Sequence, residues 1–255
     1  MKLWISDIEH PETARTLMNR FPQVRLETLR FSEGDTLDAG DAAVDAFRTE
    51  YGALLQRGLS VHGPYVDLCP SSCDGLVRQT AWERCHTAWS IASSLGAESI
   101  VFHSDWKPAP YGFGFWLENV SGFWRDFLEA HQGLRIYVEN VYDAGWEGLA
   151  ALADRVPGLG LCFDAGHAHA CSPLPMEEWI RGLGSRIGHV HLHNNSGVRD
   201  EHRGFFSVPE GGLDMEGLAE LLETHLPGAD LVLELPRPEE LAASLEWAMN
   251  RLPPE

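Results

Sequence analysis

The sequence has no apolar run that approaches the roughly 18 residues a membrane helix needs. Its start, MKLWISDIEH, contains Asp7 and Glu9 before the apolar core of a signal peptide could form. Cysteine is scarce as well: the five residues are an odd number without a dense framework, and Cys69 and Cys73 lack a second pair at zinc-ribbon spacing. We therefore expect a soluble, cytoplasmic protein with reduced thiols.

Positive charge is also in short supply. Lys and Arg number 19 against 38 Asp and Glu, so the formal net charge is −19 at pH 7. Affinity for nucleic acids comes largely from Lys and Arg on phosphates, and a surface this acidic disfavours nucleic acid as a partner. The balance does not exclude a local basic groove, and carboxylates that hold metal ions are not free surface charge. We expect a small-molecule substrate and no membrane partner, and association into a homo-oligomer stays open.

The chain does contain a regular alternation of short apolar runs and amphipathic stretches. A repeated strand-then-helix pattern with helix-length connections is typical of a parallel sheet. The strands are expected at Leu3–Ile5, Val24–Glu27, Leu59–His62, Ser99–His103, Arg135–Glu139, Gly160–Asp164, Ile187–His193 and Leu231–Leu235. The helices are expected at about Glu12–Phe21, Ala42–Arg57, Leu76–Leu95, Leu117–His131, Trp146–Asp154, Met176–Leu183, Met215–His225 and Glu239–Arg251.

Eight such units in 255 residues match the size of a closed barrel. We predict an α/β protein with a single (β/α)8 TIM barrel domain over residues 1–255, because no linker divides the chain. A doubly wound open sheet is the alternative, but it typically has about five or six strands and a Gly-rich first turn. The first turn here, Ser6–Pro11, contains no glycine and no phosphate-binding loop.

Ionisable side chains stand at the ends of six successive strands, where barrel enzymes build their active sites. The motifs are HGPY, VFHSD, YVEN, FDAGH, HVHLHNN and LVLEL, and a D-x-H pair follows the seventh strand. A lone His or carboxylate there is usually a hydrogen-bonded core residue, but burying so many around one axis is costly unless they are paired or coordinated. Imidazole mixed with carboxylate suits Zn, Mn, Co or Fe. We therefore expect a divalent metal site at the C-terminal mouth.

Taken in order, the motifs resemble the xylose isomerase-like barrel superfamily, which includes sugar isomerases, sugar epimerases, inosose dehydratases and endonuclease IV of AP endonuclease family 2. The resemblance covers essentially the whole chain. It implies one metal ion, as in the epimerase branch, on four ligands: Glu139, Asp164, His191 and Glu234. The endonuclease IV branch implies up to three zinc ions and adds five ligands: His62, His103, His167, Asp200 and His202. Tyr65 stands where that branch carries a tyrosine.

The chain departs from the superfamily pattern after His191. An Asp commonly follows two or three residues later, whereas this chain has His193, Asn194 and Asn195. His189, His191 and His193 share one strand face because side chains alternate with a period of two. We interpret His191 as the ligand, His189 as structural, and His193 as a residue that faces substrate or supports a ligand.

The first hypothesis is a divalent-metal-dependent sugar or sugar-phosphate isomerase or epimerase that uses one Mn, Co or Fe ion. A metal bound by two adjacent substrate oxygens acidifies a carbon-bound proton and stabilises the enediolate. Glu139 and Glu234 would act as acid and base, and His167 or Arg203 would bind a substrate oxygen. The aromatic loop Trp106–Trp116 either binds the apolar face of a sugar or simply covers the mouth.

The second hypothesis is a zinc-dependent phosphoesterase of the endonuclease IV type, with metals bridged by Glu139. The complete ligand set favours it, but the loop Phe31–Asp38 is acidic where a duplex-binding loop should be basic. The basic residues expected near the mouth are Arg30, Lys107, Arg199, Arg203 and Arg237. They suffice for a small phosphorylated substrate rather than DNA. A metal-stabilised binding barrel is a third reading, and the net charge places sugar chemistry slightly first.

Overall fold

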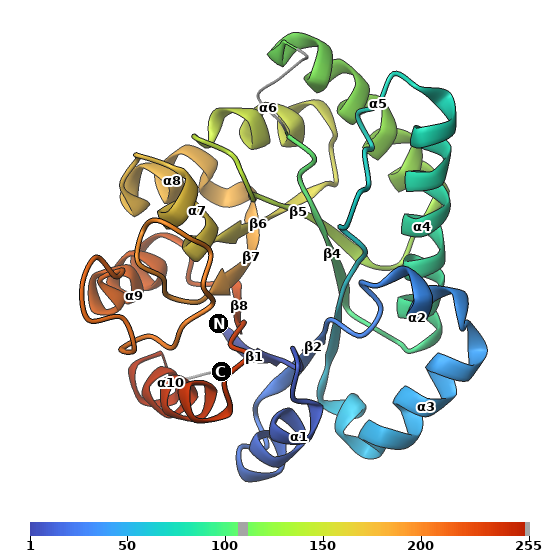
Figure 1. Cartoon of the computed structure of the whole chain (residues 1–255). Coiled ribbons are helices and arrows are strands. Elements are labelled where there is room, and N and C mark those ends of the chain that lie inside the picture. Colours follow the sequence, from blue (N-terminus) through green and yellow to red (C-terminus); the bar gives the residue numbers. More distant parts are fainter. Residues whose placement is uncertain (107–111, 253–255) are drawn as a thin grey trace.

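Eight parallel strands close into a barrel in chain order (Figure 1). The computed structural model describes residues 1–106 and 112–252. The strands are β1 (Lys2–Ser6), β2 (Arg25–Thr28), β3 (Leu59–His62), β4 (Ser99–His103), β5 (Arg135–Glu139), β6 (Gly160–Asp164), β7 (Ile187–Leu192) and β8 (Asp230–Leu233). β8 pairs with both β7 and β1, which closes the sheet. The predicted (β/α)8 barrel is confirmed.

Helices surround the barrel on its outer side (Figure 1). They are α1 (Pro11–Arg20), α2 (Gly34–Asp38), α3 (Asp41–Tyr51), α4 (Gly75–Ser94), α5 (Phe113–Ala130), α6 (Glu147–Arg155), α7 (Ala165–Cys171), α8 (Met176–Leu183), α9 (Met215–His225) and α10 (Pro238–Arg251), with 3-10 turns η1 (Gly52–Arg57) and η2 (Gly184–Arg186). Their apolar faces pack on the sheet, as the fully buried Phe127 of α5 and Trp179 of α8 illustrate. In the described part of the chain, none of these helices is long and apolar enough to cross a membrane.

The predicted boundaries agree with the structure for β3 to β6, α8 and α9. The helix expected over Ala42–Arg57 instead ends at Tyr51, because Gly52 adopts a positive φ of 50° and η1 follows. Two short helices, α2 and α7, are absent from the predicted set, since 5 and 7 residues carry little periodicity. α5 begins at Phe113 rather than Leu117. Residues 107–111 of the predicted aromatic loop, Lys107 among them, lie outside the described residues.

Ion pairs around Glu98 tie strand beginnings together at the amino-terminal end of the barrel. Nζ of Lys2 lies 2.9 Å and Nη1 of Arg25 lies 2.6 Å from the carboxylate of Glu98. Further along the barrel axis, the rings of Tyr137 and His189 stack with centroids 5.2 Å apart. This packed interior supports the ionisable residues at the carboxyl-terminal ends of the strands.

Gly63, directly after β3, approaches β4 closely. A Cβ atom at Gly63 would lie 2.5 Å from the ring of Phe102 and 3.0 Å from the carbonyl oxygen of Val101, to which the Gly63 N–H donates at 2.7 Å. We expect Gly63→Ala to lower the free energy of unfolding by about 1–3 kcal/mol, because the added methyl group overpacks this contact.

The control for this prediction is Gly122→Ala in α5, where a Cβ atom would meet no described heavy atom within 4 Å. Alanine there should raise the free energy of unfolding by roughly 0.5–1 kcal/mol through helix propensity. Urea unfolding measures both variants, and a Gly63 variant as stable as the Gly122 variant would contradict the close approach.

Candidate metal centre

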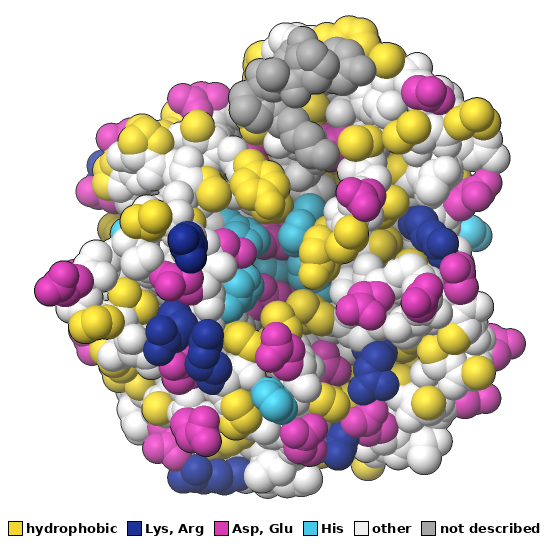
Figure 2. Space-filling model, viewed as in Figure 1, with side chains coloured by type: hydrophobic (Ala, Val, Ile, Leu, Met, Phe, Trp, Pro, Cys, Tyr) yellow, Lys and Arg dark blue, Asp and Glu magenta, His cyan; other side chains and the backbone are white. Residues whose placement is uncertain are grey.

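Histidine and acidic side chains gather in the central hollow of the barrel (Figure 2). Parallel strands bring their carboxyl-terminal ends to one rim, so residues far apart in the sequence become neighbours there. The strand-end residues are His62 of β3, His103 of β4, Glu139 of β5, Asp164 of β6, His191 of β7 and Glu234, which follows β8. All except the partly exposed His103 are buried. The structure therefore brings the residues predicted from the strand-end motifs together.

Glu139 occupies the middle of this cluster and has imidazoles around both of its carboxylate oxygens. Nε2 of His62 and Nε2 of His103 lie 3.4 and 3.5 Å from Oε2. Nδ1 of His167 and Nδ1 of His191 lie 3.1 and 3.3 Å from Oε1. Neither oxygen makes a hydrogen bond to any residue that the structure describes. Such a carboxylate is placed to bridge metal ions.

Nδ1 of His191 is the second focus of the cluster. It lies 3.3 Å from Oε1 of Glu139, 3.8 Å from Oδ2 of Asp164 and 3.5 Å from Oε1 of Glu234. All four atoms are buried and have no hydrogen-bond partner within residues 1–106 and 112–252. Buried polar atoms normally have partners, and donors about 2.0–2.1 Å from a tetrahedral metal ion lie roughly 3.3 Å apart. The donor types, their spacing and their missing partners fit a divalent metal ion.

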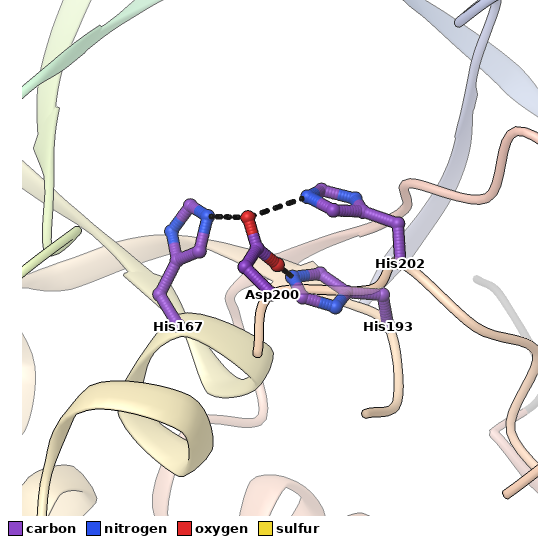
Figure 3. Close-up of side chains that lie close together, drawn as sticks. All are labelled: His167, His193, Asp200 and His202. Carbon is purple, nitrogen blue, oxygen red and sulfur yellow. Dashed lines mark hydrogen bonds and ion pairs between the residues drawn. The ribbon is translucent and has the colours of Figure 1, made fainter. Parts of the chain in front are cut away.

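A second group of donors surrounds Asp200 in the loop between β7 and α9 (Figure 3). Oδ2 of Asp200 lies 3.2 Å from Nε2 of His167 and 3.2 Å from Nε2 of His202. Oδ1 lies 3.5 Å from Nε2 of His193. His167, His193, Asp200 and His202 each offer one donor atom, and these four atoms lie within 4.8 Å of one another. This group can hold a metal ion beside the first cluster.

The protonation of these groups reflects the balance between burial and opposite charges. Burial favours the neutral acid at Glu139, but the surrounding imidazoles outweigh it and hold the pKa well below the ordinary value. Burial favours neutral imidazole at His191, yet nearby anionic groups raise its pKa well above the ordinary value. At His103 burial wins and lowers the pKa to about 3. Carboxylates among imidazoles are the charge arrangement that a divalent cation would stabilise.

Glu27, a residue that the sequence analysis did not select, supports this site from the middle of β2. One carboxylate oxygen pairs with Nε2 of His189 at 2.8 Å and accepts a hydrogen bond from the Ser60 hydroxyl at 2.6 Å. The other lies 2.8 Å from Nε2 of His191. Glu27 thus directs Nδ1 of His191 toward the cluster, as carboxylates commonly orient histidine ligands. Glu27 belongs to no strand-end motif, but a glutamate within an apolar strand could have indicated a buried carboxylate with a polar partner.

Amide side chains fix the backbone around the ligands. The Asn140 side chain accepts from the Asp164 N–H at 2.9 Å and donates to the Asp164 carbonyl at 2.8 Å. Asp164 in turn caps α7 by accepting from the His167 N–H. Asn195 donates to the Gly166 carbonyl at 2.7 Å, which ties the β7–α9 loop to α7. The uncharged Asn194 and Asn195 therefore hold loop backbone instead of supplying ligand charge.

The four predicted substrate residues have different surroundings. The ring of Tyr65 stacks on His103 with centroids 4.4 Å apart, and Trp106 borders a cavity near the cluster. His193 is completely buried within the Asp200 group. Arg203 is bound by Glu240 of α10, with Nη2 of Arg203 2.8 Å from Oε1. The Arg203 guanidinium is therefore held in an ion pair, which no sequence motif predicted.

The comparisons with known proteins agree with this geometry. Residues 27–251 match the family described as xylose isomerase-like TIM barrel. The uncharacterized protein MJ1311 of Methanocaldococcus jannaschii is 30% identical over 182 residues, which are 66% of this chain and 61% of that protein. The matches cover 49% to 61% of the length of the curated relatives.

Solved structures share the fold. The TTHB071 protein from Thermus thermophilus, soaked with ZnCl2, is 24% identical with a TM-score of 0.75 over 98% of both chains. A D-tagatose 3-epimerase-like protein is 23% identical with a TM-score of 0.76, over 99% of this chain and 97% of that one. Endonuclease IV from Thermus thermophilus is 22% identical with a TM-score of 0.68 over 99% of both chains. These identities show a shared barrel and leave the reaction to be argued from the site.

The first prediction from the site concerns Glu139→Gln. Because Glu139 contacts imidazoles through both oxygens, its loss should remove most of the bound metal. Mass-spectrometric metal analysis of protein purified without chelator measures this. Glu118→Gln, an exposed change on α5, is the matched control and should keep the wild-type metal content. Full metal content in the Glu139 variant would refute the bridging position.

A second prediction concerns pH in the metal-free protein. Burial lowers the pKa of His202, but Asp200 and other carboxylates outweigh it and raise the pKa from 6.5 to about 9. Because the folded pKa is raised, this stabilisation is present below pH 6.5 and is lost as pH rises through 9. Chelator-treated protein should therefore lose free energy of unfolding across this range, as urea unfolding at several pH values would measure.

His202→Gln should reduce this pH dependence in the metal-free protein, because glutamine does not titrate. Metal-loaded protein should behave in the opposite way, since ligating imidazoles must be neutral and metal binding strengthens as pH rises. Metal-free wild type whose stability rises steadily to pH 9 would contradict the raised pKa of His202.

Proposed function

Because the chain belongs to the xylose isomerase-like TIM barrel family, we propose that it is a divalent-metal-dependent isomerase or epimerase of a small sugar or sugar phosphate. The observation that carries this proposal is a cavity of about 380 Å³ beside the candidate metal centre. His103, His167 and Asp200 contribute to its wall. The cavity lies near the lower end of the range for small-molecule sites, roughly 300–1,000 Å³.

The lining of the cavity suits a polyhydroxylated substrate. The rings of Tyr65, Trp106 and Trp124 line it together with the polar side chains of Ser104 and Asp105. Aromatic faces bind the apolar face of a sugar, while polar groups fix its orientation. Among the described lining residues there is no Lys or Arg. This composition favours a neutral ring or chain of hydroxyls at the position next to the cluster.

The ligand residues proposed for this metal are Glu139, Asp164, His191 and Glu234, while His62 and His103 would hold an additional ion at Glu139. When bound, the metal supplies positive charge that stabilises negative charge on substrate oxygens. Oε1 of Glu234 has no hydrogen-bond partner among the described residues and lies 3.5 Å from Nδ1 of His191, while Oε1 of Glu139 lies 3.3 Å from the same nitrogen. Two carboxylates that flank one position can take a proton at one oxygen and return it from the other.

A second candidate function, a zinc-dependent phosphoesterase, is favoured by the imidazoles around both oxygens of Glu139. A carboxylate in this position is suited to bridge two metals, as in two-metal hydrolytic sites. The substrate would be small rather than DNA, because two of the cations predicted near the mouth have other partners. Arg30 pairs with Glu50 at 2.8 Å, and Arg203 pairs with Glu240.

The test uses the metal-loaded protein with a panel of ketoses, polyols, sugar phosphates, phosphomonoesters and a duplex with an abasic site. We expect turnover of a sugar, and Glu234→Gln should lower kcat by about 10²–10⁴ because a proton-transfer group is lost. Glu239→Gln, an exposed neighbour on α10, is the control and should keep wild-type turnover.

Metal stoichiometry on the same preparation separates the two candidates further. One Mn, Co or Fe ion per chain that is lost in Glu234→Gln supports the isomerase or epimerase, with or without a further ion in the Asp200 group. Three zinc ions together with cleavage of phosphoesters, but no change in any sugar, would reverse the ranking. Salt-sensitive binding or cleavage of the abasic duplex would contradict the exclusion of DNA.

A further inference from the structure

We propose that His193 is a fourth protein ligand in the Asp200 group, so that His167, His193, Asp200 and His202 form a closed, structural metal centre. The inference rests on the proposed metal dependence and goes beyond it, because it assigns this centre a role distinct from the reaction. A tetrahedral centre with four protein ligands is typical of structural sites, whereas catalytic sites keep a position open.

The positions of the donor atoms support four ligands. Oδ2 of Asp200 lies 3.2 Å from Nε2 of His167 and from Nε2 of His202, and Oδ1 lies 3.5 Å from Nε2 of His193. The group therefore presents three imidazoles to the two oxygens of one carboxylate, with one donor atom of each residue within 4.8 Å of the others. In Figure 3, His167 lies on one side of the Asp200 carboxylate, and His193 and His202 lie on the other. The ring of His193 lies parallel to that of His202, with centroids 3.8 Å apart.

The His193 imidazole is buried and requires a polar partner or a metal ion. The side chain has no exposed surface, and neither ring nitrogen makes a hydrogen bond in the described part of the chain. Nε2 also lies 3.2 Å from Oδ1 of Asp164, an oxygen that accepts from the His167 N–H at 2.6 Å, so it faces carboxylates of both clusters. An imidazole without partners at this depth is costly. A metal ion on Nε2 would satisfy it.

The sequence makes room for this ring at Gly166. A Cβ atom at Gly166 would overlap Cε1 and Nε2 of His193, so any other residue there would displace the imidazole. His202, a ligand two residues after Asp200, has a positive φ of 44°, which is unfavourable for a residue with a side chain. Both features are consistent with side chains positioned for a common ligand.

The consequence is a metal that ties the β7–α9 loop to α7. His167 belongs to α7, while His193, Asp200 and His202 follow β7. The loop also forms part of the cavity wall, because Asp200 lines the cavity. A closed centre gives a substrate phosphate no coordination position, so this arrangement favours the isomerase or epimerase over the phosphoesterase.

The test compares wild type with His193→Ala, Gly166→Ala and His169→Ala. In chelator competition, the His193 and Gly166 variants should bind one of the metal ions with an affinity that is lower by more than about a hundredfold. Changes outside the ligand shell cost only 10–100-fold, and the loss of a ligand should cost more. His169→Ala is the matched control: its Nε2 contacts the Gly211 carbonyl at 2.7 Å and links the same loop to α7 without a place in the donor group. It should keep wild-type affinity.

Two further measurements use Co²⁺ alone and imidazole. The visible absorption of four-coordinate Co²⁺ should weaken in His193→Ala, and added imidazole should restore both the absorption and the affinity. Imidazole would not restore them if His193 only packed beside the metal without binding it. Wild-type affinity and spectrum in His193→Ala would overturn the inference while leaving the proposed function intact. A wild-type protein that binds no metal under any of these conditions would overturn both.

Discussion

The burial of the Glu139 carboxylate is the constraint on which the rest of the site depends. A charged group with no exposed surface is strongly destabilising unless opposite charge surrounds it. The barrel meets this requirement with imidazoles from separate βα units, two at each oxygen of Glu139. Only a closed sheet brings so many strand ends around one axis. The barrel fold and the ionisable cluster therefore depend on each other, because the histidines need the anion as much as the anion needs them.

This constraint extends down the barrel through His191. Its Nδ1 faces Glu139, and its Nε2 faces Glu27, which is itself held by Ser60 and His189. One buried imidazole therefore lies between two buried carboxylates. A ring fixed at both ends cannot turn its donor atom away from the cluster. Preorganisation of this kind keeps a metal site rigid without help from the more exposed loops.

Much of this arrangement could be predicted from the sequence, because strand ends in a parallel barrel share one rim. The order of His62, His103 and Glu139 along the chain was enough to expect them together. Glu27 was missed because it lies within a strand and belongs to no motif. Arg203 could not be assigned, since its partner Glu240 comes from α10 and the pairing depends on how that helix packs. Such contacts are set by tertiary packing, which local spacing does not encode.

The contact between Gly166 and His193 shows where sequence reasoning ended and what the geometry adds. Both residues belong to motifs, FDAGH and HVHLHNN, yet nothing in either motif indicates that one makes space for the ring of the other. Once that space is recognised, the Asp200 group has four donors rather than three. A metal with four protein ligands stabilises a loop but offers no site to a substrate. The chemistry is then confined to the neighbouring cluster of Glu139, His191 and Glu234, beside a cavity walled by aromatic rings. This separation of a structural metal from a reactive cluster is easier to reconcile with proton transfer on a sugar than with three metals acting on one phosphate.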